Sequence, residues 1–319
     1  MRAVVQDAFG GPEVLHVADV PQPAPILTEV LVRVHAAGVN PVDWKTRAGR
    51  GAAAALGPLP FTIGWDVSGV VEQVGFGVTR FAPGDEVFGM PRFPRQAAAY
   101  ADYVTAPSRQ LARKPANLSH VEAAAIPLAA LTGWQAIVET ARIEPEQRIL
   151  IHGAAGGVGH LAVQIAKSRG ATVFGTAKAA QHDFLRGLGA DELIDYTAAR
   201  FEDEVADLDV VLDLIGGETS LRSVSTLRRG GLLIVVPSGA DQSVLTEAER
   251  QGARATNIMV EPDYAALEQI AALAESGRLR VEIDAVFPLE EAAKAHEHGE
   301  TRSSRGKIVL SVAPGEPTA

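Results

Sequence analysis

The sequence of 319 residues contains no cysteine. That absence excludes disulfides, thiolate zinc sites, cysteine-ligated iron–sulfur clusters and a cysteine nucleophile. The eight histidines do not group into a metal site. The nearest pair, His296 and His298, is two residues apart and would not share one face of a helix. We therefore expect no bound metal.

Positive charge is also scarce. The chain has 29 Lys and Arg residues against 39 Asp and Glu residues, so its net charge is −10. Nucleic acids and anionic membranes both need a basic protein face, so neither is an expected partner. The N-terminal residues lack the apolar region of a signal peptide, and the most apolar longer segment, 121–138, is interrupted by polar residues and a proline. We expect a soluble, cytoplasmic protein.

Glycine, in contrast, is plentiful, and four of the 31 glycines lie close together in one informative turn, at 153, 156, 157 and 159. Strand-like residues 148–151 run into this turn, and the apolar-periodic run 161–166 and a second strand-like run, 171–176, follow it. Ala154, Gly156 and Gly159 have the spacing of G-x-G-x-x-G, with alanine in first place. This pattern is the dinucleotide fingerprint, in which backbone N–H groups approach a pyrophosphate at a helix N-terminus. The cofactor contacts expected here are Ala155, Gly156, Gly157 and Val158.

The residues after the second strand indicate which dinucleotide binds. NAD-binding chains usually carry Asp or Glu about 20 residues after the glycines, to bond the ribose 2′-hydroxyl. This chain has Thr176 and Lys178 there, and no carboxylate before Asp183. Lys178 and the Thr176 hydroxyl would attract a 2′-phosphate, which favours NADPH, although Lys178 could also be an ordinary surface lysine.

The texture of the sequence changes near residue 120. Short alternating runs such as 29–35 and 68–74, separated by turn signals, predict a largely β, barrel-like unit before that point. Helices alternating with buried strands predict a doubly wound α/β unit after it, with strands at 148–151, 171–176, 192–195, 210–215 and 232–236. A helix over 264–276 ends this unit. Strands at 281–287 and 307–312, with a helix at 289–298 between them, return to the β texture.

Taken in order, several motifs resemble the zinc-free, quinone oxidoreductase-like branch of the medium-chain dehydrogenase/reductase family. They cover nearly the whole chain and are found at 38–43, 64–71, 84–89, 101–103, 131–134, the glycine turn and 305–310. The resemblance implies a GroES-like β-barrel catalytic domain built from residues 1–122 and 278–319. A Rossmann domain with a doubly wound parallel sheet, residues 123–277, would be inserted. Relatives also suggest a homodimer formed through Rossmann-domain edges.

The resemblance implies an activity as well. Zinc-dependent relatives have Gly-His-Glu where this chain has Gly64, Trp65 and Asp66, so no metal would activate the substrate. What remains is hydride transfer from NADPH to a small molecule that is already electrophilic, a quinone or an α,β-unsaturated carbonyl. Two other functions stay open: an enoyl-thioester reductase of the same fold, and a non-catalytic NADPH-binding redox sensor.

The resemblance finally assigns roles to single residues. Asn40 matches a polar residue that faces the nicotinamide, and Thr132, read as a helix start, matches a position near the cofactor; both could instead be caps or turn residues. Tyr196 matches a tyrosine that contacts the 2′-phosphate, or is packing, and Arg305 could reach the same region. Because ligands bind at the carboxyl edge of a parallel sheet, the ends of the next two strands add further expected cofactor contacts. These are Leu214, Ile215, Val236, Pro237 and Ser238.

The proton donor and the substrate pocket each leave two interpretations. Lys45 stands where some quinone reductases of this family have a tyrosine. It could protonate the product enolate if it is sufficiently buried; otherwise it is a positioning or surface residue and water is the source. Trp44 and Trp65 could form flat apolar walls around a planar substrate, or could be core aromatics.

Overall fold

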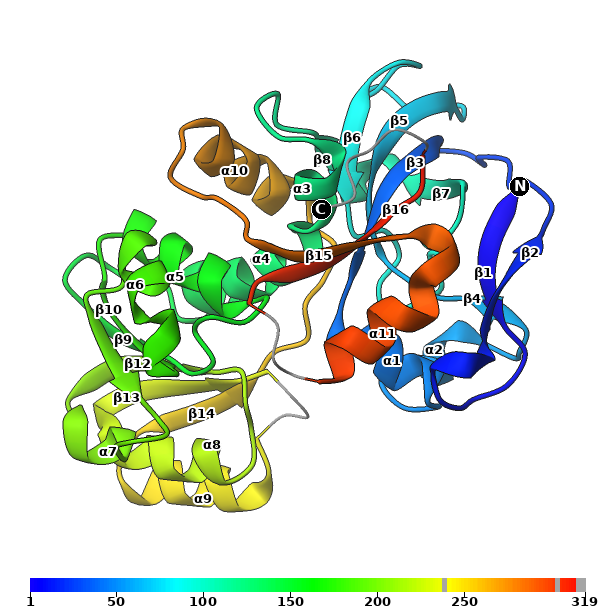
Figure 1. Ribbon diagram of the computed structural model, residues 1–319. Helices are drawn as coiled ribbons and strands as arrows, with labels where there is room; N and C mark the ends of the chain where they lie inside the picture. Colours follow the sequence, from blue (N-terminus) through cyan, green and yellow to red (C-terminus); the bar gives the residue numbers. More distant parts are fainter. Residues whose placement is uncertain (237–239, 302–304, 314–319) are drawn as a thin grey trace. The chain divides into compact units, whose positions relative to one another are not determined.

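The computed structural model describes residues 1–236, 240–301 and 305–313. It divides into two compact units (Figure 1), unit 1 with Met1–Leu131 and Glu261–Ala319, and unit 2 with Thr132–Val260. Unit 1 is the β-rich, GroES-like unit, and unit 2 is the doubly wound α/β unit that the sequence predicts.

The boundaries of the units differ from the expected ones, because segments 123–131 and 261–277 belong to unit 1. Helix α10 (Tyr264–Glu275) packs against strand β8 (Leu111–Arg113). The Arg80 guanidinium lies 4.0 Å from the centre of the Tyr264 ring and 2.6 Å from Glu268. These contacts attach α10 to unit 1, although its apolar periodicity looks like that of a Rossmann helix.

Unit 1 contains two sheets. The larger sheet has seven strands in the order β15-β16-β3-β5-β6-β8, with β7 paired to β3. Besides β8, its strands are β3 (Glu29–Val39), β5 (Asp66–Val74), β6 (Glu86–Gly89), β7 (Tyr103–Pro107), β15 (Ile283–Pro288) and β16 (Lys307–Ser311). The smaller has the order β2-β1-β4, with β1 (Arg2–Gln6), β2 (Leu15–Asp19) and β4 (Phe61–Thr62). The helices around them are α1 (Pro41–Arg47), α2 (Ala53–Leu56), α3 (His120–Ala124), α11 (Ala292–Glu300), and the short η1 (Pro12–Val14), η2 (Ser108–Gln110) and η6 (Leu289–Glu291). Strand β16 brings the end of the chain beside β3.

Unit 2 is a six-stranded parallel sheet in the order β11-β10-β9-β12-β13-β14. The strands are β9 (Arg148–Ile151), β10 (Thr172–Ala177), β11 (Glu192–Asp195), β12 (Leu208–Asp213), β13 (Leu227–Val235) and β14 (Arg254–Asn257). Its helices are α5 (Gly159–Ser168), α6 (His182–Gly187), α7 (Phe201–Glu204), α8 (Glu218–Ser223), α9 (Gln242–Arg250), η3 (Gln135–Thr140), η4 (Ala179–Gln181) and η5 (Val224–Thr226), and α4 (Pro127–Trp134) spans the boundary with unit 1. Figure 1 shows α5 and α6 on one side of the sheet and α8 and α9 on the other. This cover on both faces explains why the strands are continuous apolar runs.

The predicted strands of unit 2 are confirmed, two of them with the bounds observed for β9 and β11. Strand β14 is the strand of this sheet that the sequence did not predict. Its residues, Arg254–Asn257, are polar apart from Ala255 and none of them is fully buried. An edge strand with little burial has no hydrophobic pattern to indicate it.

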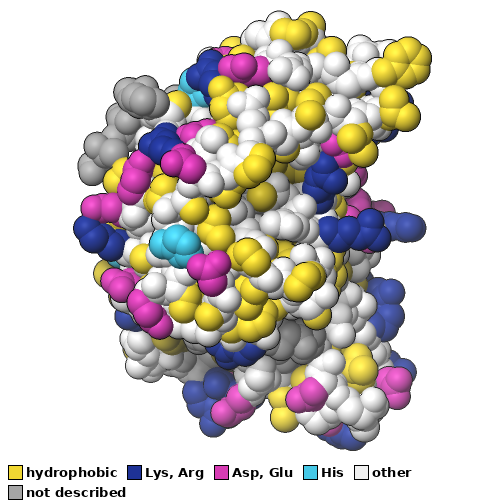
Figure 2. Space-filling model, turned by 90° about the vertical axis from the view of Figure 1, so that its right-hand side faces the viewer, with side chains coloured by type: hydrophobic (Ala, Val, Ile, Leu, Met, Phe, Trp, Pro, Cys, Tyr) yellow, Lys and Arg dark blue, Asp and Glu magenta, His cyan; other side chains and the backbone are white. Residues whose placement is uncertain are grey.

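The surface carries charges of both signs. Figure 2 shows basic and acidic side chains interspersed over one face of the molecule. Within the described ranges, no helix combines the length and the apolar character that a membrane span needs.

A buried polar cluster fastens β16 to the rest of unit 1. Lys307 donates from Nζ to the carbonyl of Val39 at 3.2 Å and to the side-chain oxygen of Asn40, and Nζ lies 3.9 Å from Asp66 Oδ2. Asp66 also accepts from Asn40 Nδ2 and from the N–H of Leu128, each at 2.9 Å. Burial raises the pKa of Asp66 to about 6 although the positive charge of Lys307 lowers it, and burial lowers the pKa of Lys307.

We expect Lys307→Met to lower the free energy of unfolding by about 3 kcal/mol at pH 8, because a buried charge loses its partner. The loss of stability should shrink toward pH 5, because buried Asp66, whose native pKa is raised to about 6, then takes up a proton and no longer needs a cationic partner. A carboxyl with a raised native pKa stabilises the fold at low pH, and this contribution is lost as pH rises through that pKa. Urea denaturation at the two pH values measures both effects. The control is Lys307→Met combined with Asp66→Asn, which should be more stable than the single variant at pH 8; equal stability of the two would contradict the ion-pair explanation.

Candidate functional site

The glycine turn joins β9 to α5 and exposes its backbone. Gly153 has φ of +65°, and a Cβ on Gly159 would lie 2.3 Å from the Gly153 carbonyl oxygen and 2.7 Å from the Ala154 Cα. No side chain fits there, so the chain can turn this tightly only with glycine. Residues 155–158, the expected cofactor contacts, are all partly exposed in front of the ten-residue helix α5. Such a turn fits a pyrophosphate.

The turn lies where the strand order of the sheet reverses. Strand β9 has β10 on one side and β12 on the other. The N–H of His152 donates to the Leu212 carbonyl at 3.0 Å, and the N–H of Ala154 donates to the Thr176 carbonyl at 3.1 Å. In open α/β sheets, this reversal at the carboxyl edge is the place where ligands bind.

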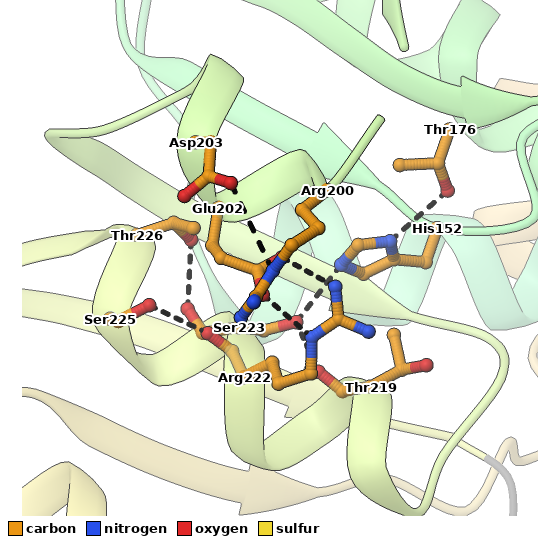
Figure 3. Close-up of polar contacts among 10 residues, drawn as sticks. All are labelled: His152, Thr176, Arg200, Glu202, Asp203, Thr219, Arg222, Ser223, Ser225 and Thr226. Atoms are coloured by element: carbon orange, nitrogen blue, oxygen red, sulfur yellow. Dashed lines mark hydrogen bonds and ion pairs between the residues drawn. The ribbon is translucent and has the colours of Figure 1, made fainter. Parts of the chain in front are cut away.

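A buried histidine, His152, connects the turn to strand β10 and to helix α8 (Figure 3). His152 Nε2 lies 2.9 Å from Ser223 Oγ, and its Nδ1 lies 3.1 Å from Thr176 Oγ1. Ser223 gives its own hydrogen to the Thr219 carbonyl at 2.6 Å, so it accepts from Nε2–H. Nδ1 then accepts the Thr176 hydroxyl hydrogen, and Thr176 Oγ1 accepts the N–H of Gly153 at 3.3 Å. The network assigns a single tautomer, with the proton on Nε2.

The surroundings keep this imidazole neutral. Burial lowers the pKa of His152 to about 4, against an opposing effect of Asp213. The ring packs edge-on against Phe201 with centres 4.5 Å apart. Nearby, Glu202 is paired with Arg222 at 2.5 Å and with Arg200 at 2.8 Å, and the hydrogen bond from Arg222 lowers the pKa of Glu202 to about 2.

The turn after β12 is held by Asp213. One carboxylate oxygen accepts the N–H groups of Ile215 and Gly216 at 2.8 and 3.0 Å, and the other accepts the Ser220 hydroxyl at 2.5 Å. This arrangement leaves Leu214 partly exposed and Ile215 exposed. Val236, after β13, is also at this edge, since its N–H donates to the Asp213 carbonyl at 3.0 Å. Pro237 and Ser238 lie outside the described residues.

Lys178 and Tyr196 are brought together by the register of the sheet. Ala177 and Asp195 are paired at the ends of β10 and β11. Lys178 and Tyr196 are the next residues of the two strands, so they lie at the same edge of the sheet. Lys178 is exposed and Tyr196 is 53% exposed. The carboxylate at this edge, Asp195, accepts the hydroxyl and the N–H of Thr197 at 2.7 and 2.9 Å.

The structure corrects the role expected for Thr176. Thr176 is 3% exposed, and its hydroxyl donates its hydrogen to His152 Nδ1 rather than pointing outward to a phosphate. Thr132 also differs from its expected place. It lies near the end of α4, not at a helix start, and is buried before the π-helical segment η3.

The site residues expected in unit 1 have mostly internal partners. Asn40 is 1% exposed and its amide is bonded to Lys307 and Asp66, which favours the structural interpretation. Trp65 is 0% exposed and donates from Nε1 to the Arg95 carbonyl at 2.7 Å, so the core alternative holds and the pocket interpretation is not supported. Arg305 is paired with Glu282 at 2.6 Å.

Two expected site residues of unit 1 lie on α1. Lys45 is half-buried there. Trp44 is half-buried, and a Cβ on Gly299 of α11 would come 2.6 Å from its ring, so this tryptophan packs closely on α11. Neither geometry tests the substrate or proton-donor roles, which stay predictions.

His152, Asp213 and Ser223 are not among the site residues expected from the sequence. The histidines were considered there only as metal ligands. A signal was available for His152, because it is a polar residue directly between a buried apolar strand and the glycine turn. No local pattern marks Ser223, which is 71 residues away in the chain.

His152→Phe is expected to flatten the pH dependence of the free energy of unfolding between about pH 4 and 6.5. The native pKa of about 4 lies below the 6.5 of the unfolded chain, so the unfolded state binds one more proton over that interval. This proton makes stability fall by about 1.4 kcal/mol for each pH unit of acidification. Urea titrations across the interval measure the difference in slope. Phe201→Leu, which loses packing but no proton, should keep the wild-type slope, whereas a His152→Phe curve parallel to wild type would contradict the neutral buried state.

Comparisons with known proteins agree with this geometry. Residues 27–116 match a family model described as the alcohol dehydrogenase GroES-like domain. Residues 188–310 match a second family model, described as zinc-binding dehydrogenase. The NAD(P)H oxidoreductase RTN4IP1, mitochondrial, of Mus musculus is 33% identical over 98% of this chain and 89% of that protein.

Solved structures match both units. The quinone oxidoreductase from Coxiella burnetii is 38% identical with a TM-score of 0.93, covering 98% of this chain and 99% of that chain. The Escherichia coli quinone oxidoreductase complexed with NADPH is 28% identical with a TM-score of 0.87, covering 98% of this chain and 100% of that chain. With the glycine turn at the reversal of a doubly wound sheet and a GroES-like unit from both chain ends, this chain belongs to the quinone oxidoreductase-like branch of the medium-chain dehydrogenase/reductases, a family of nicotinamide-dependent oxidoreductases.

Proposed function

We propose that the chain is an NADPH-dependent oxidoreductase that transfers hydride to quinones or α,β-unsaturated carbonyls without zinc. The observation that carries the proposal is the exposed pair Lys178 and Tyr196 at the edge of the sheet that also bears the glycine turn. A cation beside an aromatic ring at this place suits a 2′-phosphate, whereas an acid would repel it.

The described residues fit the rest of the dinucleotide. The exposed backbone of residues 155–158, at the N-terminus of α5, would hold the pyrophosphate. Leu214, Ile215 and Val236 would border the adenosine and the nicotinamide. When bound, the reduced nicotinamide supplies the hydride, and the protein orients it and excludes water. The relative from Escherichia coli, solved with NADPH, supports this cofactor.

The nature of the acceptor follows from the residues that the chain lacks. There is no cysteine to ligate zinc, and Trp65 occupies the position of a histidine in zinc-dependent relatives. Without a Lewis acid the acceptor must already be electrophilic, as quinones and enones are. The relative from Coxiella burnetii, a quinone oxidoreductase, supports this class. The proposal includes a small-molecule substrate, a cytoplasmic location and a homodimer, with Lys45 or water as the proton source.

The direct test is the loss of reduced-nicotinamide absorbance with NADPH and with NADH, against quinones, enones and an enoyl thioester. The proposal expects turnover with quinones or enones and a preference for NADPH. Turnover with the thioester alone would establish the enoyl-thioester reductase instead. Thermal stabilisation by NADPH without any oxidation of it would establish the redox sensor.

Lys178→Gln should raise KM for NADPH roughly tenfold or more, because a charge-assisted contact to the 2′-phosphate is lost. KM for NADH should not change, since NADH has no such phosphate. Steady-state kinetics with both cofactors measure the effect. Arg250→Gln, which removes an exposed cation on α9 of the same unit, is the control and should leave both constants unchanged. An unaltered NADPH preference in Lys178→Gln would remove the basis for the cofactor assignment.

Prolonged incubation with a strong chelator should leave turnover of quinones and enones unchanged, because the proposed reaction needs no metal. Elemental analysis of the purified protein before and after treatment provides the control. Activity that falls with chelation and returns with added zinc would show that the proposed zinc-free chemistry is wrong.

A further inference from the structure

We propose that His152 is a positioning residue for the dinucleotide. Through Thr176 it fixes the first N–H of the glycine turn, and through Ser223 it joins that turn to the helix that follows β12. This inference rests on the proposed function, because it concerns the same cofactor-binding edge.

The first step of the argument is the orientation of one hydroxyl. Thr176 receives two hydrogen bonds from the start of the turn, from Gly153 N–H on Oγ1 at 3.3 Å and from Ala154 N–H on its carbonyl at 3.1 Å. A threonine hydroxyl rotates freely unless a partner accepts its hydrogen. His152 Nδ1 accepts that hydrogen at 3.1 Å, so the oxygen keeps a lone pair for Gly153.

The second step concerns the other side of the ring. Ser223, which accepts from Nε2, is the last residue of α8, and Ser220 of the same helix is bonded to Asp213. Asp213 in turn holds the N–H groups of Ile215 and Gly216. One imidazole therefore connects the two turns that would border the cofactor. A neutral imidazole suits this place because it donates and accepts at once, which neither a phenyl ring nor a charged side chain can do.

A second buried histidine holds the middle of the turn. His160, on the first turn of α5, has Nδ1 2.8 Å from the Gly156 carbonyl, so Nδ1–H donates to it. The Gly156 N–H bonds in turn to the Gly153 carbonyl at 3.0 Å. Two points of the turn, Gly153 and Gly156, are thus held through buried imidazoles, while residues 155–158 stay partly exposed.

These contacts distinguish positioning from recognition of the 2′-phosphate. The glycine turn would meet the pyrophosphate, which NADPH and NADH share. Loss of His152 or of the Thr176 hydroxyl should therefore weaken both dinucleotides by the same factor. A Thr176 hydroxyl that touched the 2′-phosphate would instead matter for NADPH alone.

The experiment is calorimetric measurement of Kd for NADPH and NADH with the full chain, at a temperature well below unfolding. His152→Phe and Thr176→Val should each raise both constants by roughly three- to tenfold, the effect of a lost hydrogen bond. The double variant should be no worse than either single one, because the two residues act in one chain of bonds. KM for NADPH should rise with kcat unchanged at saturation. Unchanged constants in His152→Phe, or an effect of Thr176→Val confined to NADPH, would overturn the proposal.

Three variants separate positioning from general loss of stability. Phe201→Leu removes the ring that packs on His152 but none of the hydrogen bonds, so it should lower Tm and leave both Kd values unchanged. A weakening equal to that of His152→Phe would show that packing is responsible. If His152→Phe does not fold, His152→Asn, which keeps an acceptor near Thr176, and His152→Gln, which reaches only toward Ser223, take its place. The His152→Asn variant should then bind both dinucleotides more tightly than the His152→Gln variant. Equal affinities of the two variants would overturn the proposal.

The failure of this inference and that of the proposed function give different results. Wild-type protein that neither binds NADPH nor oxidises it would contradict the proposed function. Wild-type protein that binds NADPH as proposed, with variants that bind it equally well, would contradict the positioning role of His152 alone.

Discussion

The carboxyl edge of the unit 2 sheet, where the proposed cofactor would lie, depends on one neutral imidazole placed between two hydroxyls. His152 donates to Ser223 and accepts from Thr176, and the direction of each bond determines the next, out to the backbone of Gly153. Burial keeps the ring uncharged by lowering its pKa to about 4. A protonated ring would carry two donors, and Thr176 could keep its bond to the ring only by turning its hydrogen away from Nδ1. The hydrogen bonds at the start of the turn are therefore linked to the charge of a side chain beneath it.

Unit 1 is held together differently, by groups that are buried as charged or readily charged partners. Besides Lys307 and Asp66, Asp43 accepts the Tyr100 hydroxyl at 3.0 Å and the N–H of Asn40 at 2.6 Å. Burial raises the pKa of Asp43 to about 7, with these hydrogen bonds acting in the opposite direction. Asn40, directly before α1, is also bonded to Asp66 of β5 and Lys307 of β16, so the cluster connects segments from both ends of the chain. These bonds also account for Asn40, whose amide is occupied within the unit.

The motifs of this family are thus of two physical kinds. The glycine turn, Lys178 and Tyr196 present exposed groups at the edge where we propose that the cofactor binds, and their positions follow from the parallel register of the strands. Asn40, Asp66 and Lys307 also lie in motifs that carry the resemblance, yet they are buried and bonded to one another. A residue that recurs in a motif can therefore serve the fold rather than the reaction, and only burial and partners separate the two cases.

The sequence by itself determined the two kinds of unit, most strands of the parallel sheet, the glycine turn and the family. Those features depend on neighbours within a few residues, as alternation, apolar runs and glycine spacing do. Strand β14, the attachment of α10 to unit 1, the burial of Trp65 and the inward hydroxyl of Thr176 were decided by tertiary structure. The bonds from His152 to Thr176 and Ser223 join residues 24 and 71 positions apart. Such partners come into contact only when strands pair and helices pack, so no local sequence pattern predicts these bonds.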